Sequence, residues 1–212
     1  MTSSPRFHLT KAHIAKALNA LSEREPAVAM AVAQVGFPDE RRRAHGFEAL
    51  ARIIIGQQVS TKAAAAIAAR VTQTLGGEIA PERVLAARDE DLRGSGLSGQ
   101  KLSYLRALTD AVTTRALPIT DLHGMSDEEV VACITQIKGF GEWSAHMYLM
   151  FSLGRTDVWP VGDLAVRAGF GRIMKMEERP TPKQTEMAAS HLKPYRSALA
   201  LLCWKFYSEA PL

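Results

Sequence analysis

Cysteine is scarce in this sequence. Cys133 and Cys203 are the only two among 212 residues, and each stands in an apolar segment with helical spacing. A disulfide or a metal role for these two cysteines is the less favoured interpretation, and none of the six histidines shows the spacing of a metal site. We expect both cysteines to be buried free thiols in a reducing compartment.

Long apolar runs are also absent. No segment approaches the roughly 20 apolar residues that cross a bilayer, and residues 1–6 lack the apolar run of a secretory signal peptide. These absences predict a cytoplasmic protein with no membrane contact, associated with the nucleoid if the source is bacterial. With 47% hydrophobic residues the chain can bury a substantial core, and we expect a monomer.

The alternation of apolar and polar residues that marks a half-buried strand is missing as well. Apolar residues instead recur at helical spacing, which predicts an all-α fold. Ser126 and Glu129 have capping-box spacing, and Pro81, Pro182 and Pro194 are placed as first-turn prolines. The predicted helices span residues 10–21, 25–35, 46–56, 61–75, 81–87, 99–114, 126–137, 142–153, 163–174, 181–192 and 194–208.

Net charge says little about the partner. Lys and Arg number 26 against 22 Asp and Glu, and the resulting excess of +4 suits a polyanion only weakly. The placement of particular residues is more informative. Gly139-Phe140-Gly141 cannot sit inside a good helix, so residues 127–153 should form a helix, a tight hairpin and a second helix. Backbone N–H groups at such a turn can bind a phosphate, although an ordinary interhelical turn has the same pattern.

Five segments together resemble the helix-hairpin-helix base-excision DNA glycosylases, and in particular the 3-methyladenine DNA glycosylase II branch. The resemblance runs from about Gly46 to Tyr207, with Lys138 in place of the hairpin proline, and it does not include the N-terminal sheet domain of the bacterial enzyme. It implies a single glycosylase unit over residues 1–212, all-α and two-lobed, with a cleft between the lobes. The lobes would be 1–45 plus 155–212, and 46–154. The segments that carry the resemblance are residues 54–60, 96–98, 137–143, 158–163 and 192–197.

Asp163 is a lone carboxylate at the start of a predicted helix. From its position alone, an N-cap aspartate is the simpler interpretation. The resemblance implies in addition that Asp163 is the catalytic aspartate, and the two roles are compatible. An anion beside C1′ stabilises the oxocarbenium-like transition state of glycosidic cleavage, and an alkylated purine departs without a dedicated general acid.

Trp143 follows Gly141-Glu142, where related glycosylase-lyases place a Schiff-base lysine. An indole forms no imine, so the resemblance implies a monofunctional enzyme that uses water. An aromatic residue here would also stack on a flipped cationic base, although a core tryptophan is an equally good interpretation. The base-pocket candidates are Trp143, Trp159, Tyr195 and Met147, the last standing where the family has a further aromatic.

The resemblance also implies a set of DNA contacts. In the family, a residue of the loop after the apolar run at 53–55 wedges into the duplex, and Gln58 is the candidate here; a polar helix end is the alternative. The backbone carbonyls of Thr135, Ile137 and Phe140 would hold a structural Na⁺ or K⁺ ion. The predicted DNA-binding residues are Gln57, Gln58, Ser60, Lys62, Lys138, Gly139 and Gly141.

The resemblance therefore implies a monofunctional base-excision repair glycosylase. It would flip alkylated purines of the 3-methyladenine and 7-methylguanine type out of double-stranded DNA and hydrolyse their N-glycosidic bonds. No cofactor is required, and the four clustered cysteines of the iron–sulfur relatives are missing. Two alternatives remain: a deaminated or oxidised base as substrate on the same scaffold, and a non-catalytic helix-hairpin-helix DNA-binding module.

Overall fold

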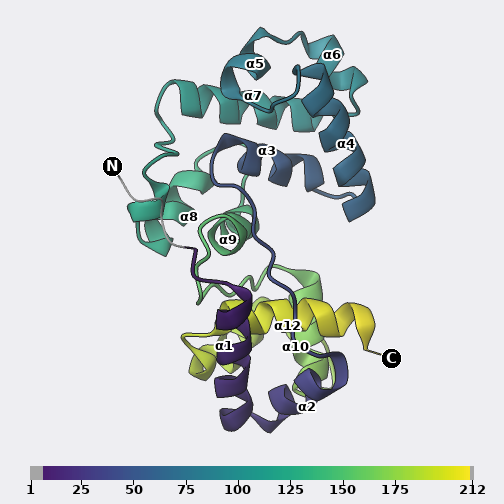
Figure 1. Ribbon diagram of the computed structural model, residues 1–212, viewed down its shortest axis with the longest axis vertical. Coiled ribbons are helices and arrows are strands. Elements are labelled where there is room, and N and C mark those ends of the chain that lie inside the picture. Colours follow the sequence, from purple (N-terminus) through teal and green to yellow (C-terminus); the bar gives the residue numbers. More distant parts are fainter. Residues whose placement is uncertain (1–6, 211–212) are drawn as a thin grey trace. The chain divides into compact units, whose positions relative to one another are not determined.

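The apolar residues at helical spacing do form helices. The computed structural model describes residues 7–210, and within them the chain forms twelve α-helices, two short 3-10 helices and no strand (Figure 1). The prediction of an all-α fold is confirmed. None of these helices combines the length and the apolar character needed to cross a membrane. The signal-peptide prediction concerns residues 1–6, which lie outside the described residues.

The described residues divide into two units. Unit 1 comprises residues 7–42 and 149–210, and unit 2 comprises residues 43–148. The chain returns from unit 2 to unit 1 between residues 148 and 149, inside helix α9 (Glu142–Phe151). The boundary predicted from the sequence lies after residue 154. The other helices of unit 1 are α1 (Lys11–Arg24), α2 (Pro26–Val35), α10 (Leu164–Ile173), α11 (Pro182–Ala188), a 3-10 helix (Ser190–Leu192) and α12 (Arg196–Glu209). Those of unit 2 are α3 (Phe47–Gly56), α4 (Thr61–Thr74), α5 (Pro81–Ala86), α6 (Asp89–Gly94), α7 (Gly99–Thr113), a 3-10 helix (Leu122–Gly124) and α8 (Asp127–Thr135).

Capping residues set many of the helix starts. Ser126 and Glu129 form the predicted capping box at α8, and Pro81 and Pro182 occupy first-turn positions. The prediction for Pro194 is wrong, because α12 begins at Arg196 after a cis Lys193–Pro194 peptide bond. Helix α6 was not predicted. With six residues and one buried side chain, Leu92, it is too short to show a helical period.

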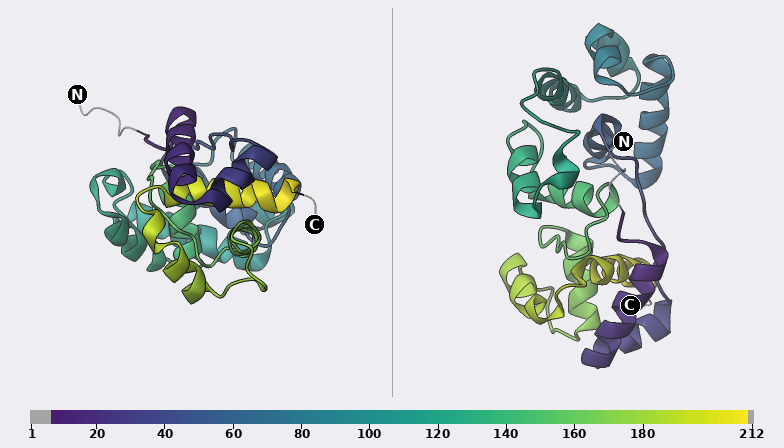
Figure 2. Two further views of the ribbon diagram at one scale, coloured as in Figure 1. Left: turned by 90° about the horizontal axis from the view of Figure 1, so that it is seen from below. Right: turned by 60° about the vertical axis from the view of Figure 1, so that its left-hand side comes forward.

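Helix α12 forms the centre of unit 1. It packs against α1, α2 and α10 (Figures 1 and 2). Nine of its side chains are buried. Its approach to α10 depends on Gly169, because a Cβ atom there would lie 2.2 Å from the Cys203 carbonyl oxygen. Burial, with a smaller contribution from the Asp163 charge, raises the pKa of the Cys203 thiol. Cys203 is therefore an inert core residue, and Cys133 is a free thiol that is only half-buried.

Helix α3 is buried along most of its length in unit 2. It packs against α4 and α7, and α7 also packs against α5 and α6 (Figure 1). The hydroxyl of the buried Tyr148 accepts a hydrogen bond from the Gly46 N–H, 3.2 Å away, at the start of α3. Burial raises the pKa of Tyr148 to about 12, so this hydroxyl is neutral at physiological pH.

Candidate active site

Asp163 is the N-cap of α10. Its Oδ1 accepts a hydrogen bond from the Val166 backbone N–H at 2.9 Å, so the predicted capping role is confirmed. The same oxygen accepts a second hydrogen bond, at 3.0 Å, from the indole Nε1–H of Trp204 in α12. Two donors from two helices fix the orientation of the carboxylate. A fixed anion of this kind can stabilise positive charge that develops in a substrate.

Trp204 is a member of this site that the sequence did not reveal. Its half-buried ring lies 5.8 Å from the ring of Phe151 and 5.9 Å from the guanidinium carbon of Arg41, both distances taken to the Trp204 ring centroid. It stands in an apolar helix, where a tryptophan usually contributes to the core. One signal could have found it. A partly buried indole N–H needs an acceptor, and the neighbouring apolar side chains offer none.

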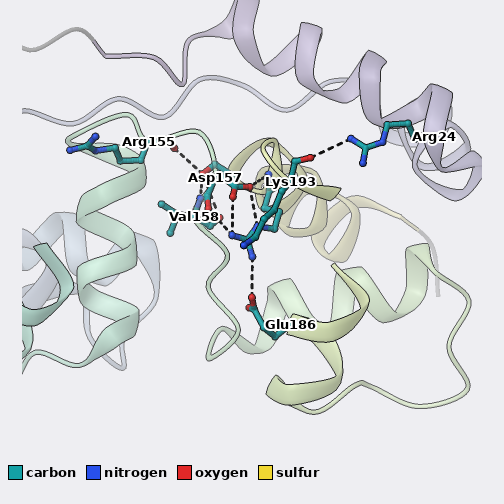
Figure 3. Close-up of polar contacts among 8 residues, drawn as sticks. Arg24, Arg155, Asp157, Val158, Glu186 and Lys193 are labelled. Carbon is teal, nitrogen blue, oxygen red and sulfur yellow. Dashed lines mark hydrogen bonds and ion pairs between the residues drawn. The ribbon is translucent and has the colours of Figure 1, made fainter. Parts of the chain in front are cut away.

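The loop that leads to Asp163 is tied to the first residues of α12. The guanidinium of Arg196 donates to both oxygens of Asp157 at 2.9 Å and, through Nη1, to Glu186 at 3.0 Å (Figure 3). The adjacent Ser197 hydroxyl accepts from the Val158 N–H and donates to the Arg155 carbonyl, each at 2.8 Å (Figure 3). Helix α12 thus holds this loop at residues 155–158 and the carboxylate at its end.

Three of the predicted base-pocket residues are buried or half-buried in the structure. Trp159 is 4% exposed, donates through Nε1 to the Thr185 carbonyl at 3.3 Å and meets the ring of Phe170 edge-on. Met147 is 5% exposed. Their burial favours a role in the core over the predicted contact with a base. Tyr195 is half-buried beside His13, with ring centroids 6.2 Å apart, and its predicted contact with the base stays a prediction.

The hairpin of the helix-hairpin-helix motif lies in unit 2, between α8 and α9. Gly139 has φ +95°, and a Cβ atom on it would lie 2.2 Å from the Tyr104 ring, so only glycine fits there. Gly141 is exposed at the start of α9, where a Cβ would meet open space. The first glycine is therefore required by packing against Tyr104, and the second leaves the helix N-terminus accessible to an approaching group.

Two exposed side chains flank Gly139-Phe140-Gly141. Lys138 directly precedes Gly139, and Trp143, in the first turn of α9, is 37% exposed. This exposure does not support a core role for Trp143, the alternative that the sequence left open. A cation and an aromatic ring next to an accessible helix N-terminus suit a polyanion that carries flat bases.

The hairpin carbonyls are compatible with the predicted Na⁺ or K⁺ ion. The Ile137 carbonyl accepts a hydrogen bond from the Phe140 N–H at 3.0 Å, and a second lone pair on its oxygen can serve a cation. Whether it joins the carbonyls of Thr135 and Phe140 in holding an ion stays a prediction. Between residues 7 and 210, no group of three or more His, Cys, Asp or Glu side chains could hold a metal.

The segment after α3 holds the remaining predicted DNA contacts. Gln58 is exposed and has φ +54°, an uncommon conformation for a residue with a side chain. The Ser60 hydroxyl caps α4 by accepting from the Ala63 N–H at 3.2 Å, and Lys62 is exposed in the first turn. Gln57 differs from these residues, because its amide Nε2 donates to the Gly139 carbonyl at 2.9 Å.

Comparison with known proteins identifies the family. The family described as "HhH-GPD superfamily base excision DNA repair protein" matches this chain over residues 51–194, a range that includes the hairpin and Asp163. The chain therefore belongs to the HhH-GPD superfamily of base excision DNA repair proteins.

The chain is also similar to several proteins named as 3-methyladenine DNA glycosylases or glycosidases. The chain is 33% identical over 162 residues to DNA-3-methyladenine glycosylase 1 of Schizosaccharomyces pombe, covering 75% of this chain and 71% of the relative. It is 30% identical over 197 residues to DNA-3-methyladenine glycosylase of Saccharomyces cerevisiae, covering 76% and 67%. The solved structure of the S. pombe enzyme Mag1 with abasic DNA is similar at a TM-score of 0.83 and 31% identity, covering 90% of this chain and 95% of that chain. A DNA-3-methyladenine glycosidase from Bacillus halodurans is similar at a TM-score of 0.80 and 31% identity, covering 91% and 89%.

Proposed function

We propose that this protein is a monofunctional DNA glycosylase that removes alkylated purines of the 3-methyladenine and 7-methylguanine type from double-stranded DNA. The observation that carries the proposal is the Asp163 carboxylate, held by the Val166 N–H and the Trp204 N–H, in a chain of this family. The 3-methyladenine activity named for relatives of 30% and 33% identity supports the substrate class.

The chemistry follows from the leaving group. Alkylation at N3 or N7 makes the purine cationic, so the C1′–N bond breaks with the electron pair going to the base and positive charge remaining on the sugar. The Asp163 carboxylate stabilises that charge, and water then adds to C1′ and loses a proton. Preorganised groups of this kind are typically worth about 3 to 4 kcal/mol. The departing base is already activated, so the proposed reaction needs no separate general acid.

The product is an abasic site in an intact strand. Strand cleavage by the lyase route needs an amine that forms an imine with the sugar, and Trp143 stands where such a lysine would be. The proposed reaction requires only water and the carboxylate, and a Na⁺ or K⁺ ion at the hairpin would be structural. We place the enzyme where its DNA is, in the cytoplasm and at the nucleoid if the source is bacterial, and we expect it to act as a monomer.

A panel of duplexes, each carrying one modified base, tests this function. Incubation followed by alkali should reveal abasic sites in the 3-methyladenine and 7-methylguanine duplexes and leave those with deaminated or oxidised bases intact. Without alkali, all strands should stay whole, since no imine-forming lysine is present at the site. Excision confined to deaminated or oxidised bases would replace the proposed substrate class. DNA binding with no excision of any base would indicate a non-catalytic module.

Trp143→Ala should reduce excision of cationic alkylpurines more than it weakens binding of undamaged DNA. An exposed indole that stacks on a flipped base contributes roughly 1 to 3 kcal/mol, which corresponds to about 5- to 150-fold in single-turnover rate. Phe37→Ala is the matched control, because Phe37 is an aromatic residue of similar exposure, 43% against 37%. Equal losses of excision and of binding in Trp143→Ala, or a collapse of its melting temperature, would assign Trp143 to the fold instead.

A further inference from the structure

A single side chain connects two surface segments of unit 2. Gln57 directly follows α3, and its Nε2 donates a hydrogen bond of 2.9 Å to the carbonyl of Gly139, 82 residues further along the chain. Gln57 and Gly139 are both half-buried, whereas Gln58 and Lys138, beside them in sequence, are exposed. The hydrogen bond therefore joins two segments, residues 57–60 and 138–141, each of which carries exposed side chains.

The hairpin end of this hydrogen bond is fixed by packing. Gly139 lies against the Tyr104 ring so closely that a Cβ atom would overlap it. The Tyr104 hydroxyl in turn accepts a hydrogen bond from Gln100 Nε2 at 2.6 Å. The Gly139 carbonyl is therefore a fixed acceptor, and it can act as an anchor for a neighbouring loop.

The other end is fixed on both sides of Gln58. The Lys101 ammonium donates to the Ile55 carbonyl at 2.7 Å in the last turn of α3, and burial lowers the pKa of Lys101. Ser60 caps α4. Between these two anchors Gln58 has φ +54°, a conformation that persists only where its surroundings enforce it. The Gln57 hydrogen bond is made by the residue directly before this strained one.

We propose that Gln57 is a positioning residue that joins residues 57–60 to the hairpin, so that Gln58 and Lys138 are presented to DNA at a fixed separation. This inference rests on the proposed function, and it replaces the prediction that Gln57 itself contacts DNA. Flipping a base requires one group to enter the stack while another holds the backbone, and a loop that is already ordered loses less entropy on binding. Without the Gln57 amide, the loop would have to be ordered by the DNA.

Hydrogen–deuterium exchange of the DNA-free protein tests directly whether Gln57 holds residues 57–60 and 138–141 together. Gln57→Met keeps the unbranched side chain and removes the amide donor, and Gln58→Met makes the same change at the exposed neighbour. We expect exchange over residues 57–60 and 138–141 to rise about fivefold in Gln57→Met, the factor typical of one net hydrogen bond, and to stay at the wild-type level in Gln58→Met. Gln57→Lys, which restores a donor, should return exchange toward wild type.

Single-turnover excision tests whether the Gln57 hydrogen bond matters for the reaction. In Gln57→Met the excision rate should fall at least fivefold, while the melting temperature and the affinity for undamaged duplex stay near wild type. Reduced excision with unchanged exchange would mean that Gln57 contacts DNA directly. Raised exchange with unchanged excision would mean that the hydrogen bond between Gln57 and Gly139 does not assist base flipping. Either result overturns the proposal. A wild-type protein that excises no alkylated base would refute the proposed function, and the exchange comparison would still decide whether Gln57 joins the two segments.

Discussion

Asp163→Asn should nearly abolish excision of alkylated purines while leaving affinity for damaged DNA within a few fold. Asparagine retains a side-chain oxygen that can accept from both the Val166 N–H and the Trp204 N–H, so the geometry of the site should survive. What is lost is the negative charge that the proposed mechanism places beside C1′. A loss of about 3 kcal/mol of transition-state stabilisation corresponds to more than a hundredfold in the single-turnover rate.

The measurement is single-turnover excision from a 7-methylguanine duplex with the mutant in excess. A melting curve serves as the control, since asparagine is as good an N-cap as aspartate and should leave the start of α10 intact. If the folded mutant excises at close to the wild-type rate, Asp163 only caps α10, and the catalytic group lies elsewhere.

Helices were predictable where local chemistry determines them. The Ser126 and Glu129 capping box fixes the start of α8, and the Gly139-Phe140-Gly141 turn separates α8 from α9. Helix α6 was missed because one buried leucine in six residues gives no period. Pro194 was misplaced for a related reason: a proline suits the first turn of a helix, but it equally suits the extended segment before one.

The site was predictable only in part. An aspartate at the start of an apolar periodic run indicates a cap, and its resemblance to a family motif indicates a catalytic role. Trp204 is 41 residues away from Asp163, and no local pattern connects them. Their contact depends on the close crossing of α10 and α12, which the absence of a side chain at Gly169 permits. Trp159 is close to Asp163 in sequence, but its burial in unit 1 depends on contacts with Phe170 and Thr185 that no local pattern reveals.

Trp204→Phe should lower the excision rate about tenfold without weakening DNA binding. Phenylalanine keeps an aromatic ring beside Phe151 and Arg41 but removes the N–H that donates to Asp163 Oδ1 at 3.0 Å. The carboxylate would then keep the Val166 backbone donor but lose the indole donor, and the broad terminal torsion of aspartate would let it rotate. A hydrogen bond to a charged group contributes roughly 1.5 to 3 kcal/mol, and the lower end of that range gives about tenfold.

Trp159→Phe is the matched control for this prediction. It makes the same indole-to-phenyl change in unit 1 and also removes an Nε1 hydrogen bond, the one to the Thr185 carbonyl at 3.3 Å, which does not involve Asp163. Trp159 is 4% exposed, so we expect its variant to lose melting temperature and to keep most of its excision rate once folded. Trp204→Phe should show the opposite pattern. Parallel losses of rate and of melting temperature in both variants would mean that Trp204 supports the fold of unit 1 and has no specific effect on the Asp163 carboxylate.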